Sequence, residues 1–350
     1  VATLDCGVNY YLNETADEYE FGIATSKYQP FFPKTLVKLL DEPSALSFVH
    51  HLPRMDGDIE LYPLYTAFAR AAYPSAYYDP YDTSGKSAVA CDSYDKIRRL
   101  VEGDSDIAFM ANVTEEDYKT AADAGLELNL LPIGKEALVF FVNSKNRVNG
   151  LSQEEALQIY SGEIWNWSFV KDGKASGAIT PYQLGGRRGE TEAFKKIMSG
   201  VKLAKPPELL YYDDKLPYLF GRAAEYKNRK NALGIAYRFL VEETLNEAHR
   251  KGIKLLKIDG VEPSIENISS GAYPYSNYFY AVTIKNRPVA TAIKIPFDRV
   301  DVDTKTRIEN TQKLLDWILS EQGQSLVEKT GYAPLKYGIS ASEAVRVPVF

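Results

Sequence analysis

The fold of this chain is decided by residues 132–167. This stretch holds the apolar run Leu138-Val139-Phe140-Phe141-Val142-Asn143, followed by Gly150-Leu151-Ser152 and by Tyr160-Ser161-Gly162-Glu163-Ile164-Trp165-Asn166-Trp167. A continuous apolar run of this length predicts a strand. The glycine and serine that follow predict a turn and then a helix, so the stretch indicates an α/β unit.

Helix and strand signals alternate on both sides of this stretch. Residues 61–73 carry apolar side chains at helical spacing with Pro63 in the first turn, and residues 304–321 repeat the helical pattern. Residues 278–283 form a second apolar run of the strand type. The alternation predicts an α/β fold with mainly parallel sheets flanked by helices.

Local signals also predict the limits of single elements. Thr114 with Asp117, and Ser152 with Glu155, have the spacing of capping boxes and predict the starts of two helices. Residues 234–239 are predicted to form another strand.

The length of 350 residues favours two lobes over one core. Two strands that cross between lobes make a hinge, so the runs at 138–143 and 278–283 predict a two-lobe clamshell. The expected parts are an N-terminal extension over residues 1–52 that packs on the first lobe, a first lobe over 53–137 and 276–338, a second lobe over 138–275, and a C-terminal tail over 339–350.

The composition excludes several classes of function. The net charge is −6 and the charged residues are scattered, so no basic surface for nucleic acid is predicted. No run of 18 apolar residues occurs, so no membrane-spanning helix is expected. The first residues do not show a positively charged segment followed by an apolar one, the pattern of an export signal, so the sequence leaves the location open.

The sequence also lacks the motifs of common catalytic and metal sites. Cys6 and Cys91 are too few for a disulfide framework or a structural zinc site, and His50, His51 and His249 do not have metal-ligand spacing. Phosphate-binding loops of nucleotide enzymes and hydrolase triads are missing. We therefore expect neither an enzyme nor a bound metal or organic cofactor.

Several segments, in order along the chain, resemble the phosphate-type solute-binding proteins of bacterial ABC transporters. They are Asp56-Gly57 with Leu61-Tyr62-Pro63-Leu64, Gly103 to Phe109, Pro132-Ile133-Gly134-Lys135-Glu136-Ala137, Tyr160 to Trp167, Asn231-Ala232-Leu233-Gly234, Ile258-Asp259-Gly260-Val261, and Lys329-Thr330-Gly331-Tyr332-Ala333-Pro334-Leu335. The resemblance implies a type II periplasmic-binding-protein fold that binds a small polar ligand or inorganic anion between its lobes. It further implies a monomer outside the cytoplasm, periplasmic or attached to the cell surface, that delivers the ligand to a membrane permease.

In this family the ligand is held by hydroxyl groups and by backbone N–H groups at helix N-termini, where unpaired donors suit an oxyanion. The present chain departs from that pattern. Asp58 and Glu60 stand where small hydroxyl residues are usual, and Leu184 stands where the family has an arginine. The predicted ligand-contacting residues are Asp58, Glu60, Ser93, Arg187, Arg188, Gly189, Glu190 and Thr191.

Three interpretations of these departures are open. In the first, an anion still binds through Arg187, Arg188, Ser93 and Thr191, with the acidic side chains turned outward. In the second, the acidic residues face a changed ligand, which is an amine, a zwitterion or a polyol. In the third, Asp58 or Glu190 caps its own helix and pairs with Arg188, so the anion site is filled from within and the protein has a structural or signalling role.

Overall fold

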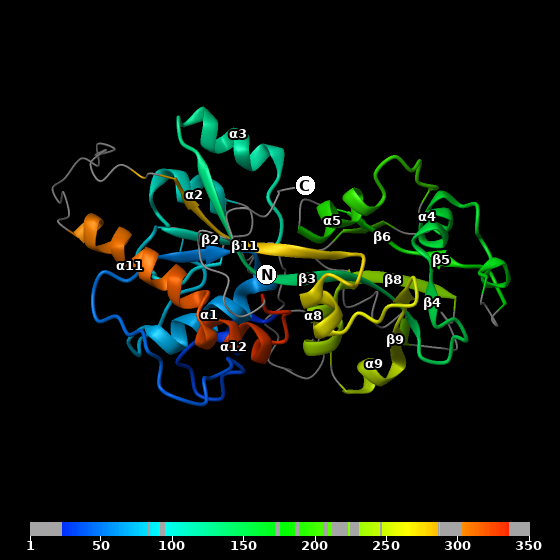
Figure 1. Ribbon diagram of the computed structural model, residues 1–350, viewed down its shortest axis with the longest axis horizontal. Helices are drawn as coiled ribbons and strands as arrows, with labels where there is room; N and C mark the ends of the chain where they lie inside the picture. The colour runs from blue at the N-terminus through cyan, green and yellow to red at the C-terminus, as the bar shows by residue number, and fades with distance from the viewer. Residues whose placement is uncertain are drawn as a thin grey trace, which may run out of the picture. The chain divides into compact units, whose positions relative to one another are not determined.

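The computed structural model describes residues 23–82, 84–91, 95–171, 176–185, 189–205, 209–211, 223–224, 231–245, 247–285, 287 and 303–335 (Figure 1). The chain divides into two compact units. The first, here called the inserted unit, lies within residues 135–277, and the second, the outer unit, comprises the described residues of 23–134 and of 278–335. The strands β3 (Leu128–Asn143) and β11 (Ser276–Ile284) each have residues in both units.

The centre of the outer unit is a short sheet. In it β1 (Met55–Gly57) pairs in parallel with β2 (Ile107–Met110), and β2 pairs antiparallel with β11. Met55 lies opposite Ile107 and Gly57 opposite Phe109. The residues that precede β1 and β2 therefore share one edge of the sheet, and the residues that follow them share the other.

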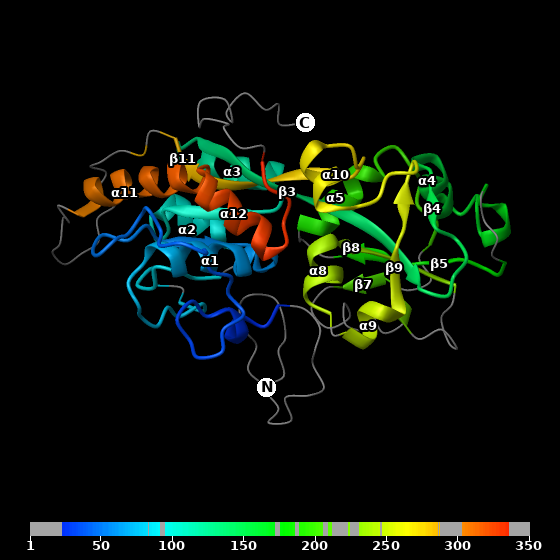
Figure 2. The same cartoon turned by 60° about the horizontal axis from the view of Figure 1, so that its bottom comes forward.

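Helices cover both faces of this sheet. One face packs on α2 (Lys96–Glu102) and α3 (Glu115–Asp123) through a core that includes Leu100, Met110 and Val282. On the other face, Tyr65 stacks on Phe109 with ring centroids 5.1 Å apart. The helices on that side are α1 (Tyr62–Ala72), α11 (Asp303–Ile318) and α12 (Glu321–Thr330), with α12 beside the other two (Figure 1 and Figure 2).

Residues 23–52 lie against the outer unit. The 3-10 helix η1 (Thr25–Tyr28) contacts α1, the backbone N–H of Phe48 donates to the carbonyl oxygen of Ala72, and the Arg70 guanidinium lies 4.6 Å from the Phe31 ring centroid. Residues 1–22 of the predicted extension and the tail 339–350 lie outside the described residues.

The inserted unit is built around the second half of β3. β8 (Ala232–Tyr237) and β9 (Ile253–Leu255) both pair antiparallel with β3. The other pairs are parallel: β5 (Thr180–Pro181) with β8, β4 (Gly150–Leu151) with β10 (Lys257–Ile258), and β6 (Gln183–Gly185) with β7 (Leu209–Tyr211). Its main helices are α4 (Gln153–Ser161), α5 (Gly189–Ile197), α8 (Arg238–Glu243), α9 (Glu247–Gly252) and α10 (Ile265–Ser270).

The predicted α/β fold class is confirmed. The antiparallel strand pairs described above each include β3 or β11. Both capping boxes are present, at Thr114 with Asp117 and at Ser152 with Glu155. The predicted strand over 234–239 is wrong at both ends: β8 begins at Ala232 and ends at Tyr237, and Arg238 opens α8.

Two buried carboxylates explain this boundary. Glu190 accepts a hydrogen bond from the backbone N–H of Tyr237, and Glu136 accepts one from that of Phe239. Because the first N–H groups of a helix have no partner within it, these acceptors stabilise a helix start at this position.

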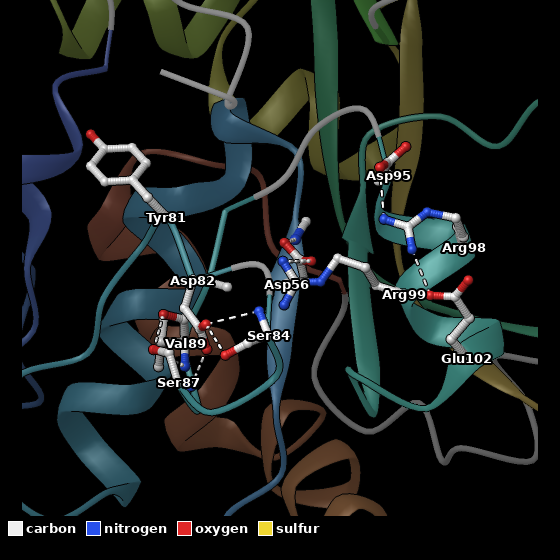
Figure 3. Close-up of polar contacts among 12 residues, drawn as sticks. Asp56, Tyr81, Asp82, Ser84, Ser87, Val89, Asp95, Arg98, Arg99 and Glu102 are labelled. Carbon is white, nitrogen blue, oxygen red and sulfur yellow. Dashed lines mark hydrogen bonds and ion pairs between the residues drawn. The ribbon is translucent and has the colours of Figure 1, made fainter. Parts of the chain in front are cut away.

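A fully buried ion pair joins β1 to α2. The Arg99 guanidinium lies 3.1 Å from the Asp56 carboxylate, and their side chains are 2% and 0% exposed (Figure 3). Asp56 also accepts a hydrogen bond from the N–H of Gly57. The neighbouring Arg98 instead pairs with Asp95 and Glu102 on the surface of α2.

Replacing Arg99 should therefore destabilise the protein strongly. Arg99→Met leaves the Asp56 charge buried without its guanidinium, and we expect the free energy of unfolding to fall by about 3–5 kcal/mol in urea denaturation. The matched surface variant Arg98→Met should change it by less than about 1 kcal/mol. Equal losses in the two variants would contradict the assigned role of the buried pair.

The stability should also depend on the protonation of Glu136. Burial, reinforced by Glu243, raises the pKa of this carboxyl from 4.5 to about 7, although the N–H groups of Ala137 and Phe239 and the charge of Arg238 act to lower it. The unfolded chain thus releases this proton at lower pH than the folded chain, so stability is lost as pH rises from about 4.5 to 7.

We expect the parent to lose about 3 kcal/mol relative to Glu136→Gln between pH 4.5 and 8, since each pKa unit corresponds to about 1.4 kcal/mol. Urea unfolding at both pH values measures this difference. The exposed Glu163→Gln serves as control and should follow the parent. A constant difference between the parent and Glu136→Gln would show that Glu136 does not titrate in this range.

Candidate functional site

The turn after β1 is the first predicted ligand element. Gly57 ends β1, Asp58 is extended, and the 3-10 helix η2 (Ile59–Leu61) leads into α1, which has Pro63 in its first turn. A side chain at Gly57 would place its Cβ 2.4 Å from the carbonyl oxygen of Phe109, so only glycine allows β1 and β2 to approach this closely. The turn consequently lies at the carboxyl ends of β1 and β2.

Asp58 is buried in this turn and has two partners. One carboxylate oxygen accepts from the N–H of Ala111, which follows β2, at 2.8 Å. The other lies 2.9 Å from the ammonium of Lys96 in the first turn of α2. The expectation that Asp58 caps its own helix is wrong, because its side chain makes no capping hydrogen bond to η2.

Lys96 pairs with Asp58 in this turn, although the family motifs in the sequence do not point to it. Burial acts to lower its pKa, but the charge and hydrogen bond of Asp58, with Asp117 and Glu60 further contributing, raise it overall, so the side chain is an ammonium. A signal for its pairing exists in the sequence. A cation at a helix start is unfavourable beside the helix dipole, and so calls for a nearby carboxylate.

Glu60 lies in the same part of the outer unit. Its side chain is buried, its charge acts on Lys96, and its carbonyl oxygen accepts a hydrogen bond from the Tyr332 hydroxyl. Asp58 and Glu60 are thus brought together, as predicted for one turn, but both side chains are buried rather than turned outward.

The second predicted element is the start of α5 in the inserted unit. Gly189, Glu190 and Thr191 form its first turn, and the side chains of Glu190 and Thr191 are buried. One Glu190 oxygen accepts from the N–H of Tyr237 at 3.2 Å, so this carboxylate supports the start of a different helix, α8.

The remaining predicted residues, Ser93, Arg187 and Arg188, lie outside the described residues. The pairing of Arg188 with either acid therefore stays a prediction. Within the described ranges, no group of three His, Cys, Asp or Glu side chains could hold a metal ion, and no helix is long and apolar enough to cross a membrane.

The chemistry of the first turn follows from these contacts. An oxyanion at the carboxyl ends of β1 and β2 would need N–H or ammonium donors. The N–H of Ala111 and the ammonium of Lys96 are already engaged by Asp58. The Asp58 carboxylate thus occupies two donors that could otherwise bind an anion.

Known proteins resemble this chain in sequence and in fold. The signature of the PBP superfamily domain matches residues 90–322, more than half of the chain. "Phosphate-binding protein PstS 2" of Streptococcus agalactiae is 36% identical over 83 residues, which cover 24% of this chain and 22% of that protein. The match therefore spans about a fifth of the length of that relative.

A longer match is found with "Phosphate-binding protein PstS" of Pseudomonas aeruginosa, which is 26% identical over 255 residues, covering 67% of this chain and 70% of that one. Among solved structures, a phosphate-bound putative phosphate ABC transporter substrate-binding protein from Clostridium perfringens has a TM-score of 0.55 at 21% identity, covering 81% of this chain and 99% of the other. An ABC-type phosphate transport receptor from Vibrio cholerae has a TM-score of 0.52 at 18% identity, covering 80% and 98%. These structures share the fold, the resemblance to phosphate-type periplasmic binding proteins is confirmed, and the chain belongs to the PBP superfamily.

Proposed function

We propose that this chain is the extracytoplasmic solute-binding protein of an ABC-type transporter, and that it acts as a monomer that delivers its solute to a membrane permease. Membership of the PBP superfamily supports this, as do the names of the relatives from P. aeruginosa and S. agalactiae. The proposed lobes keep the limits predicted from the sequence, with residues 138–275 inserted between 53–137 and 276–338.

We further propose that the solute is a small polar molecule such as an amine, a zwitterion or a polyol, rather than a bare phosphate ion. The contacts of Asp58 carry this proposal. Its carboxylate already takes the N–H of Ala111 and the ammonium of Lys96. A phosphate ion in this turn would have to compete with Asp58 for these two donors, and the Lys96 ammonium that could attract it is already neutralised by that carboxylate.

A second candidate function is a structural or signalling protein whose anion site is filled by its own side chains. The same Asp58 contacts support it, together with the contact of Glu190 to Tyr237, because both acids already have partners within the protein. The two candidates differ in whether any solute binds.

A thermal-shift panel of phosphate, sulfate, amino acids, polyamines and sugars separates the candidates. A solute-binding protein should gain about 2.7 kcal/mol when its solute is present at 100 times the dissociation constant. We expect this gain with an amine, a zwitterion or a sugar. A phosphate gain that disappears in Arg187→Ala or Arg188→Ala would overturn the changed ligand, and no gain with any solute would favour the filled site.

Asp58→Ser tests the role of the internal carboxylate. Serine restores the small hydroxyl typical of the family and releases the Lys96 ammonium and the Ala111 N–H. We expect the variant to bind phosphate at least about tenfold more tightly than the parent in calorimetric titration, since one charge-assisted hydrogen bond contributes about 1.5–3 kcal/mol.

Asp95→Ser is the matched control, because Asp95 lies beside the start of the same helix but pairs with Arg98 on the surface. It should leave phosphate affinity at the level of the parent. Equal affinities in the parent and Asp58→Ser would show that Asp58 does not exclude the anion.

A further inference from the structure

A second cluster of charged residues lies at the amino ends of β1 and β2, opposite the end that carries Asp58. Arg54 directly precedes β1 and Asp106 directly precedes β2, whereas Asp58 and Ala111 follow these strands. Since β1 and β2 are parallel, Arg54 and Asp106 meet at the amino ends of the strands. The three residues of β1 separate the two edges by about 10 Å, at roughly 3.3 Å per residue.

Two arginines converge there on the buried Asp106 carboxylate. Arg54 binds it with two side-chain nitrogens, Nε at 3.0 Å and Nη2 at 3.1 Å, and with its backbone N–H at 2.8 Å. Arg307 of α11 approaches with Nε, 3.2 Å from Oδ2 and 3.3 Å from Oδ1. A carboxylate offers about four lone-pair positions, so these contacts saturate Asp106.

A third arginine, Arg287, completes what we call the arginine cluster: Arg54, Arg287, Arg307 and Asp106. Its Nη2 donates to the carbonyl oxygen of Leu100 near the end of α2, where Arg54 donates to the carbonyl oxygen of Gly103. Burial, followed by the charges of Arg54 and Arg307, lowers the pKa of Arg287, although Asp106 acts to raise it. Arg54 and Arg287 meet at the end of α2, and Arg54 and Arg307 share Asp106, so the three guanidiniums lie near one another.

The charges of the cluster do not balance. Among the described residues, Arg54 and Arg307 contact Asp106, and Arg287 donates to the same end of α2 as Arg54 does. Three guanidiniums thus share one carboxylate, and the carbonyl groups at the end of α2 offset only about half of one of the two surplus positive charges. Among the described residues, the terminal nitrogens of Arg307 and the Nη1 of Arg54 have no hydrogen-bond partner. The Arg54 and Arg307 side chains are 17% and 20% exposed, so neither guanidinium is sealed in the core.

We propose that the arginine cluster binds a small dianionic oxyanion of the sulfate or hydrogen-phosphate class, at a site separate from the turn that carries Asp58. Two negative charges match the surplus of the cluster. The planar, forked donors of arginine suit the paired oxygens of such an anion. The bound anion would join α11, Arg54 at the start of β1 and Arg287, and so stabilise the outer unit.

Sulfate titration of the full-length chain tests this proposal, with unfolding temperature and calorimetric heat as readouts and ionic strength held constant with chloride. We expect a saturable stabilisation by sulfate, with a dissociation constant that rises about tenfold or more in Arg307→Met. The matched control Arg98→Met should bind as the parent does, because Arg98 pairs with Asp95 and Glu102 elsewhere on α2.

Two further variants keep the result interpretable. Arg307→Lys retains the charge but loses the forked donor, so it should fold and still bind sulfate several-fold more weakly than the parent. Arg187→Ala, which affects the proposed solute loop, should leave sulfate binding unchanged. Sulfate stabilisation that does not saturate, or that is the same in the parent, Arg307→Met and Arg307→Lys, would overturn the site without affecting the proposed transport function.

Discussion

The parallel pairing of β1 with β2 is the constraint on which the polar clusters of the outer unit depend. Because Met55 lies opposite Ile107 and Gly57 opposite Phe109, the residues before the strands meet at one edge and those after them meet at the other. Asp106 thereby reaches the backbone and side chain of Arg54, and Asp58 reaches the N–H of Ala111. A slip of one residue in register would separate both pairs.

Both edges are built on a buried carboxylate, but their charge balance differs. A buried carboxylate is stable only when it is paired and hydrogen-bonded. Asp58 meets this need with one ammonium and one N–H, and in doing so occupies donors that an anion would use. Asp106 is surrounded by more cations than it can neutralise. The contacts of Asp58 therefore leave no surplus positive charge, whereas those of Asp106 do.

Local signals in the sequence predict what local contacts decide. The capping boxes at Thr114 and Ser152 form as expected, since each needs only residues within one helical turn. The end of β8 could not be placed in this way. Arg238 begins a helix because the N–H groups of that turn are held by Glu136 and Glu190, which lie about 100 and 50 residues earlier in the sequence.

Local sequence signals also fail to predict the side-chain partners in the candidate site. The family resemblance identifies the turn that contains Asp58, but the strand β1 that places this turn at the end of the sheet was not predicted. The partner that fixes its charge, Lys96, comes from a separate helix, and Arg307 reaches Asp106 from a position 201 residues away. Motif spacing cannot supply such pairings, because they arise only when strand register and helix packing are combined. The charge balance at each end of β1 and β2 is therefore set by which cation the fold brings to each carboxylate, so the effect of an acidic residue in such a turn depends on its partner.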